Sequence, residues 1–225
     1  MGYTLVYTQV LEFLPYLING AWISLQIAVL AFFGGMFLGL IFATIRTFGN
    51  QISNKIVICY VTFFTNTPQL VQIYFLFFAL PEFGILLSPY IAVLLGMTLN
   101  AAAYLCEIQR AGFLSIRQNE LDAAKTLNFS LIQQVKYVIL PHIMKVLFPP
   151  LSNHYIIMTL GTSMAAIFGV EELTGRAFNI NSETFRSVEI FSITALIYIV
   201  ITFIATFLLA IIGRYFFKAK IRIIQ

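Results

Sequence analysis

The chain has 225 residues, of which 60% are hydrophobic and 10% are charged, whereas a soluble globular domain carries charges at about 25% of its positions. Together with a mean hydropathy of +0.91, this composition excludes a soluble protein and favours a single membrane domain over residues 1–225. The net charge of +4 comes from scattered basic residues without a nucleic-acid-binding motif, so it does not indicate a nucleic-acid partner. We interpret Cys59 and Cys106, which lie in apolar stretches, as small hydrophobic residues rather than a disulfide or metal pair.

Five uncharged segments, each of 24 residues or more, divide the chain: 13–45, 56–81, 83–106, 146–170 and 190–213. A helix needs roughly 20 residues to cross a bilayer, and the lipid interior favours helices because they satisfy their own backbone groups. The residues before the first segment contain no Lys or Arg, so we do not expect a cleaved signal peptide. We predict an all-α membrane protein with five transmembrane helices, at about 19–46, 56–80, 88–108, 143–168 and 190–214.

The charged residues predict the orientation of these spans. With five spans, 11 of the 13 basic residues fall on one side: Arg46, Lys55, Arg110, Arg117, Lys125, Lys136, Lys145, Arg214, Lys218, Lys220 and Arg222. The other side has only Arg176 and Arg186. Because basic loops stay in the cytoplasm, we expect the N-terminus outside and the C-terminus in the cytoplasm.

The predicted spans differ in polarity. The fifth is almost wholly apolar and is expected to meet lipid, whereas the second and fourth carry hydrogen-bonding side chains. Pro68 lacks the N–H that would bond to the carbonyl of Phe64, so we expect a kink in the second span. Pro149 and Pro150 are expected to disturb the start of the fourth span.

The polar residues of the spans have two interpretations. They either form hydrogen bonds between helices around a tolerated proline, or line a path for a polar solute near the middle of the membrane. The candidate path residues are Asn66, Thr67, Pro68, Gln69, Gln72, Asn100, Asn153 and Thr162. His154 is interpreted as a hydrogen-bonded packing residue, and its role stays open.

Acidic residues near the predicted membrane edges also have alternatives. Glu107 lies three residues before Arg110, so we favour a surface ion pair over a substrate-binding carboxylate. Glu171 and Glu172 are expected on the outer surface, either solvated or in contact with a partner.

The cytoplasmic segment at about 117–141 is too apolar and helix-prone for a simple connector. Asn119 is expected to cap a first short helix, and Asn128 suits a left-handed terminator. Ser130 and Gln133 then match a capping box, and Pro141 is expected to end the second helix.

The first helix of this loop would expose an apolar ridge of Leu121, Ala124 and Leu127, and such a ridge needs a partner. The alternative is an amphipathic helix on the lipid surface, which Lys125 and Lys136 would favour.

The spacing of Asp122-Ala123-Ala124, Asn128 and Val138-Ile139-Leu140-Pro141 resembles the EAA signature of bacterial ABC importer permeases, E-A-A-x3-G-x9-I-x-L-P. Further fragments resemble the polar amino-acid uptake subfamily, and the resemblance covers about residues 19–218: Thr67-Pro68, Leu70-Val71-Gln72, Leu99-Asn100, Ala103-Tyr104, Glu107, Ser152-Asn153 and Gly169-Val170-Glu171-Glu172-Leu173. Asp122 replaces the usual Glu and Asn128 the usual Gly, and both substitutions should preserve coupling. His154 and Leu160 stand where relatives commonly have an acidic and a basic residue.

The resemblance implies the type I permease subunit of an ATP-driven importer in the bacterial inner membrane, which moves a polar amino acid inward by alternating access. It implies four kinds of partner: two cytoplasmic ABC ATPase subunits, a second identical or homologous permease, an extracytoplasmic solute-binding protein and the amino-acid substrate. ATP and Mg would bind the ATPase and no cofactor this chain, because the sequence has no G-x4-G-K-[ST]. The ATPase-coupling residues it implies are Asp122, Ala123, Ala124, Asn128, Leu140 and Pro141.

Two other functions remain as alternatives. An ion-coupled secondary transporter would need carboxylates within its spans, and the five uncharged segments have none. An intramembrane enzyme would need a catalytic motif, and neither H-E-x-x-H nor G-x-S-x-G is present, so we expect a non-catalytic subunit. Cationic, acidic, amide and opine substrates all stay open, as do a homodimer and a heterodimer of permeases.

Overall fold

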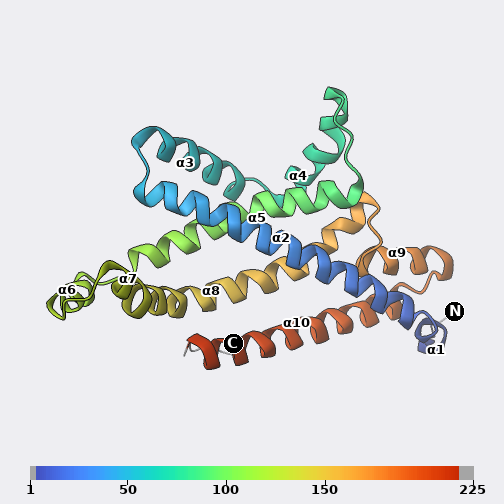
Figure 1. The fold of residues 1–225 in the computed structure, drawn as a ribbon. Helices are drawn as coiled ribbons and strands as arrows, with labels where there is room; N and C mark the ends of the chain where they lie inside the picture. Colours follow the sequence, from blue (N-terminus) through green and yellow to red (C-terminus); the bar gives the residue numbers. More distant parts are fainter. Residues whose placement is uncertain (1–3, 218–225) are drawn as a thin grey trace.

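The computed structural model describes residues 4–217, and within this range the chain is helical without a strand. Four long helices lie lengthwise beside one another (Figure 1): α2 (Leu14–Phe48), α5 (Pro89–Leu114), α8 (Leu140–Gly161) and α10 (Ser187–Phe217). At one end of these helices lie α1 (Tyr7–Leu11) and α9 (Leu173–Thr184), and at the other end lie α6 (Gln118–Thr126) and α7 (Leu131–Gln134). The predicted all-α fold class is confirmed.

The pair α2 and α5 forms the centre of the fold because small residues let the two backbones approach closely. A Cβ added at Gly35 would lie 2.6 Å from the Cβ of Ala101, and one added at Gly39 would lie 3.0 Å from the backbone nitrogen of Cys106. Larger side chains at these two glycines would push the helices apart. The main core beside this contact includes fully buried Ile27 and Leu105.

The second predicted span differs most from the sequence-based expectation. Instead of one kinked helix at 56–80, the chain forms α3 (Gln51–Thr65) and a second helical stretch that starts with α4 (Gln69–Tyr74). The two directions differ by 104°. Pro68 precedes α4 with an extended ψ of 133°. Its ring lacks the backbone donor that a continuous helix would use here, and it disfavours helical geometry in the preceding residue, Thr67. The helix breaks here and changes direction.

Two short helical turns complete the second stretch before α5. A π-helical turn, η1 (Phe75–Ala79), leads into a 3-10 turn, η2 (Leu80–Phe83), which ends at Gly84 with φ of 80°. Ser88 then caps α5 by accepting a hydrogen bond from the backbone N–H of Ile91 at 3.4 Å. In Figure 1 this segment projects away from the four long helices.

The loop at about 117–141 forms two helical pieces, as expected, but their ends differ from the prediction. The first helix, α6, starts at Gln118 after Arg117, so Asn119 is not its cap. Asn128 has φ of 55°, and Ser130 and Gln133 form the predicted capping box.

Pro141 does not end the second helix of this loop. The chain passes from α7 through the π-helical turn η3 (Val135–Ile139) into α8 without leaving helical geometry. Pro141 is the second residue of α8 and follows the π-helical turn η3 closely, so the helical path continues through it. Pro149 and Pro150 lie inside α8, which continues through them to Gly161.

The chain after α8 continues through a 3-10 segment and α9 into α10. After α8, a 3-10 segment, η4 (Thr162–Phe168), ends at Gly169, whose φ of 81° lies in the left-handed region that glycine tolerates. The helix α9 follows at a bend of 45°, and α10 then returns along the bundle. Little of α10 is buried, as expected for a helix that meets lipid.

Three described helices are long and apolar enough to cross a membrane: α2, α5 and most of α10. The two bent pairs, one around Pro68 and one around Gly169, raise the number to five if each pair is one span. The five-span count and the span limits therefore stay predictions.

Candidate functional site

The polar residues around Pro68 form a closed hydrogen-bond cluster. The side-chain amide of Gln72 donates to the carbonyl of Phe64 at 3.0 Å and to the hydroxyl of Thr67 at 2.7 Å. The amide of Asn100 donates to the same carbonyl at 3.2 Å and to Gln72 Oε1 at 3.0 Å. These amides satisfy the carbonyl that Pro68 leaves without a helical donor.

Three of the candidate path residues are buried within the chain. Gln72 is 7% exposed, Asn100 is 8% exposed, and Thr162 is fully buried with its hydroxyl donating to the carbonyl of Thr159 at 2.7 Å. Their polar atoms are used in intrachain contacts, so the geometry favours the helix-bonding interpretation for these three.

The other candidates lie at or near the surface around the same break. Asn66, Pro68 and Asn153 are exposed, and Thr67 and Gln69 are half-buried. A Cβ added at Gly161 would lie 3.8 Å from Gln69 Oε1, so α4 and the end of α8 meet here.

Two aromatic residues not included among the path candidates extend this surface. The rings of Tyr104 on α5 and His154 on α8 have centroids 5.7 Å apart. Tyr104 is 41% exposed, and its hydroxyl donates to the carbonyl of Thr65 at 3.4 Å. His154 Nε2 has no hydrogen-bond partner among the described residues, so the expected hydrogen-bonded packing is not seen at this atom. In the sequence, two parts of the family resemblance pointed to this pair: the fragment Ala103-Tyr104 and the position after Asn153.

A hydrophobic groove of about 530 Å³ lies between α2, α8 and α10. Nearly all its lining residues are hydrophobic, among them Phe32, Phe148 and Ile204. Such a lining suits acyl chains or apolar side chains, and it gives a charged amino acid no hydrogen-bonding partner.

The loop at about 117–141 places its candidate coupling residues on different surfaces. Asp122 is exposed and lies 3.6 Å from the ammonium of Lys125, and Ala123 is also exposed. Ala124 is only 3% exposed, so it packs within the chain, contrary to the expected exposed ridge. Leu140, 51% exposed, and Pro141 lie at the surface where α8 begins.

A larger apolar surface lies on the second half of this loop. Leu127, Leu131 and Ile132 are 68%, 80% and 78% exposed, and Val135 is 50% exposed. Exposed hydrophobic surface of this kind marks a contact with a partner or with lipid. Of the predicted ridge, Leu127 is exposed, Leu121 is half-buried and Ala124 is buried, so the prediction is confirmed at Leu127 and wrong at Ala124.

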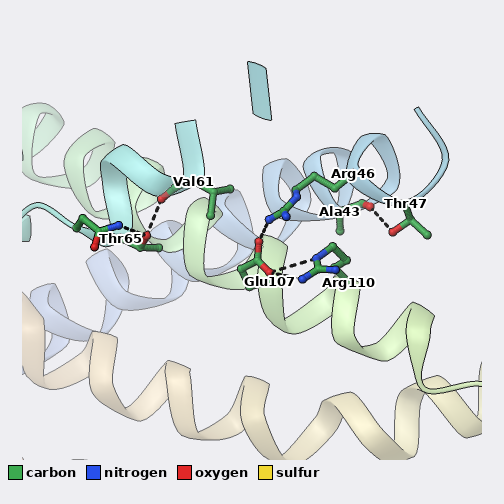
Figure 2. A network of polar contacts seen from close by, with 8 residues as sticks. Ala43, Arg46, Thr47, Val61, Thr65, Glu107 and Arg110 are labelled. Atoms are coloured by element: carbon green, nitrogen blue, oxygen red, sulfur yellow. Dashed lines mark hydrogen bonds and ion pairs between the residues drawn. The ribbon is translucent and has the colours of Figure 1, made fainter. Parts of the chain in front are cut away.

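An ion cluster joins α2 to α5 near the same end of the molecule. Figure 2 shows Glu107 between Arg46 and Arg110. Arg110 Nη2 donates to Glu107 Oε2 at 2.9 Å, and Arg46 binds the other carboxylate oxygen. The expected pair of Glu107 with Arg110 is confirmed, and the tertiary structure adds Arg46. A carboxylate neutralised by two guanidinium groups is not free to bind a substrate.

The two acidic residues predicted for the outer surface have separate environments. Glu171 is exposed, but Glu172 is fully buried, so the prediction is wrong for Glu172. Its carboxylate accepts hydrogen bonds from the hydroxyls of Ser24 at 2.8 Å and Tyr198 at 2.9 Å. It also accepts from the backbone N–H of Gly175 at 2.9 Å, as the N-cap of α9. This carboxylate therefore joins α2, α9 and α10.

Among the described residues, no group of three His, Cys, Asp or Glu side chains is placed to hold a metal ion. The chemistry that the described residues offer is hydrogen bonding to a polar solute and contact with protein partners.

Comparisons with known proteins agree with the resemblance inferred from the sequence. Residues 35–218 match the family described as binding-protein-dependent transport system inner membrane component. The glutamine transport system permease protein GlnP of Escherichia coli K12 is 37% identical over 203 residues, which are 89% of this chain and 93% of that protein. The octopine transport system permease protein OccM of Rhizobium radiobacter is 31% identical over 84% of this chain and 80% of its own length.

Solved structures show the same architecture. An amino acid ABC transporter crystallised with histidines has a chain that is 28% identical and superposes with a TM-score of 0.87, covering 94% of this chain and 99% of that one. The inward-facing MetNI methionine ABC transporter is 17% identical with a TM-score of 0.70 over 90% of this chain and 97% of its own, and this shows the fold alone.

The chain therefore belongs to the family of inner-membrane components of binding-protein-dependent transport systems, which are transport components rather than catalytic ones. It is a multi-pass inner-membrane protein with the fold of ABC importer permeases. The comparisons give no support to the alternative of an ion-coupled secondary transporter.

Proposed function

We propose that this chain is the permease subunit of an ABC importer that moves a polar amino acid into the cytoplasm by alternating access. The observation that carries the proposal is the 37% identity to a glutamine permease over nearly the whole chain. An exposed apolar surface on the loop helices, where the family's ATPase would bind, supports it.

The proposed orientation has five spans, with the N-terminus outside. The helices α6 and α7 lie at the same end of the bundle as the C-terminal end of α10 (Figure 1). Most basic residues of the sequence belong to this end, which supports its cytoplasmic location. The helix α9 and exposed Glu171 would then face the solute-binding protein.

The proposed complex contains two ABC ATPase subunits, a second permease that is identical or homologous, and an extracytoplasmic solute-binding protein. ATP and Mg bind the ATPase, and this chain holds no cofactor and performs no catalysis. Closure of the ATPases on ATP moves the loop helices, and the spans follow because α8 continues directly from this loop.

The proposed path runs along the surface next to the Pro68 break. Asn66, Gln69 and Asn153 offer neutral hydrogen-bonding groups to a zwitterion, with Tyr104 and His154 beside them. Neutral groups bind a polar solute without trapping it. Gln72 and Asn100 maintain the backbone at the break, Thr162 bonds to the end of α8, and none of the three contacts the solute.

Reconstitution tests this proposal. The chain is purified from its native membrane with the proteins bound to it, and the complex is placed in liposomes with the solute-binding protein and radiolabelled polar amino acids. We expect an ATPase to co-purify with the chain. We also expect uptake to require ATP on the side of the liposome membrane that corresponds to the cytoplasm. Uptake by the chain alone, driven by an ion gradient, would refute the proposal.

A further inference from the structure

One side chain connects the first loop helix to two of the long helices. His142, in the first turn of α8, places Nε2 at 3.1 Å from the carbonyl oxygen of Ser115, which caps the end of α5. The other ring nitrogen, Nδ1, lies 3.5 Å from Glu120 Oε2 on α6. A single imidazole thus contacts α5, α6 and α8.

The helix α6 has few other polar connections. Its side-chain contacts are internal: Gln118 donates to Asp122 at 2.9 Å, Lys125 pairs with Asp122, and Thr126 donates to the carbonyl of Asp122. Between residues 4 and 216, the contact of Glu120 with His142 is the one hydrogen bond or ion pair that joins a side chain of α6 to a long helix.

The two contacts of the ring are chemically alike. A carboxylate and a carbonyl are both acceptors, and a neutral imidazole has one N–H whereas the imidazolium has two. A neutral ring therefore donates to one of the two neighbours, and a ring with both nitrogens protonated donates to both.

The position of the ring matters for the mechanism. The helix α8 carries Asn153 and His154 further along, and α5 carries Tyr104, so both helices that the ring contacts reach the proposed path. The backbone on either side, buried Ala124 and half-buried Leu121 also link α6 to the rest of the chain.

We infer that His142 is a positioning residue, which holds the coupling helix α6 against α5 and α8 so that movement of the ATPase reaches the path. This inference rests on the proposed function. The side chain of His142 touches neither ATP nor the transported solute, and it acts through Glu120 and Ser115.

The test uses the reconstituted complex with its ATPase and solute-binding protein. His142→Ala removes both contacts, Glu120→Gln removes the charge of one partner, and His142→Gln keeps an amide donor for the carbonyl of Ser115. The matched control is Lys145→Ala, which removes an exposed positive charge one turn further along α8. Co-purified ATPase, basal ATP hydrolysis, stimulated hydrolysis and uptake per ATP are measured at equal membrane abundance.

We expect His142→Ala to keep the ATPase bound, with an unchanged KM for ATP, and to lower stimulated turnover and uptake per ATP by about twofold to fivefold, the effect of losing one partly exposed pair. His142→Gln should recover part of this loss, and Lys145→Ala should behave as the unaltered chain. Adding Glu120→Gln to His142→Ala should change nothing further, because the pair is already broken.

The outcomes distinguish a failure of the proposed function from a failure of the role inferred for His142. If the unaltered chain binds no ATPase, the proposed function fails. If the unaltered complex is coupled and His142→Ala is equally coupled, or if the two substitutions have independent effects, His142 does not position α6. A lower thermal midpoint with unchanged uptake per ATP would make its role purely structural and would also overturn the inference.

Discussion

The hydroxyl of Ser24 donates to Glu172 Oε2 at 2.8 Å, although 148 residues separate the two in sequence. The same hydroxyl oxygen accepts the backbone N–H of Leu173 at 3.2 Å, at the start of α9. Both residues are at most 1% exposed. The helix α9 is thus fixed to α2 at its first turn, and a carboxylate predicted to be a surface group is buried at the contact between helices.

Loss of the Ser24 hydroxyl is expected to destabilise the contact between α2, α9 and α10. Ser24→Ala leaves the buried backbone N–H of Leu173 without its partner, and it removes one donor from Glu172 Oε2, which Tyr198 still contacts. An unsatisfied buried group costs about 1–3 kcal/mol. The thermal midpoint of the purified chain in detergent should fall. Ser182→Ala is the control, because its hydroxyl bonds to the carbonyl of Asn179 in an exposed position. Equal midpoints for the two variants would contradict this account.

The topology is tested by labelling from outside intact cells. In a chain with Cys59→Ala and Cys106→Ala, Ser182→Cys on α9 should react with a membrane-impermeant maleimide. Gln118→Cys on α6 should react only after the cells are opened, because the basic side stays in the cytoplasm. A reporter fused after Gln225, which lies outside the described residues, should be cytoplasmic. Reaction of both cysteines in intact cells would refute the five-span orientation.

The path residues are tested with single cysteines in the same background. Asn66→Cys, Gln69→Cys and Asn153→Cys should react with small aqueous reagents, because these positions lie at the surface near the break. Gln72→Cys and Thr162→Cys should be protected, since the native side chains are buried. Leu196→Cys, on the exposed face of α10, should be protected by lipid instead. Protection of the first three would make them packing residues and remove the proposed path.

Substitutions on α6 can separate docking of the ATPase from folding of the loop. Ala123 is exposed on α6 whereas Ala124 is buried, so Ala123→Trp should overpack the contact with the ATPase by roughly 1–3 kcal/mol. Ala124→Trp should destabilise the loop of the isolated chain instead. Co-purification of the ATPase and the thermal midpoint of the chain alone distinguish the two. If Ala123→Trp binds and couples normally, this face of α6 is not the docking surface.

Removal of the charge at Glu107 tests the ion cluster. Glu107→Gln leaves Arg46 and Arg110 facing each other without the carboxylate between them. Partly exposed pairs contribute about 0.2–1 kcal/mol each, so a modest loss of stability is expected, greatest at low salt. Glu82→Gln, at an exposed position, is the control. A substrate role for Glu107 would appear instead as lost uptake at unchanged stability.

Much of the loop followed from local sequence rules. The capping box of Ser130 and Gln133 and the left-handed Asn128 depend on residues within three or four positions, so the sequence is sufficient to predict them. The cap of α6 and the end at Pro141 were predicted wrongly. The helix α6 begins at Gln118, before Asn119, and the helical path continues from η3 through Pro141 into α8.

The polar residues around Pro68 show where the sequence is insufficient. Asn66 and Gln72 are both amides close to the same proline, and composition gives no reason to separate them. In the fold, Gln72 turns inward to the carbonyl of Phe64, and Asn66 stays exposed. Pro68 predicted a kink, but the bend of 104° depends on α5, whose Asn100 satisfies the backbone opened at the break.

The sequence by itself determined the membrane location, the helical class and the family. These depend on sums over long segments: apolar length against bilayer thickness, the side that carries basic residues, and the spacing of the loop motif. Only the tertiary structure decided that Glu172 is buried under Ser24, that Arg46 joins Glu107, and that His142 lies between Ser115 and Glu120. Each of these contacts joins separate helices, and which side chains meet there depends on how the helices pack, which no local pattern encodes.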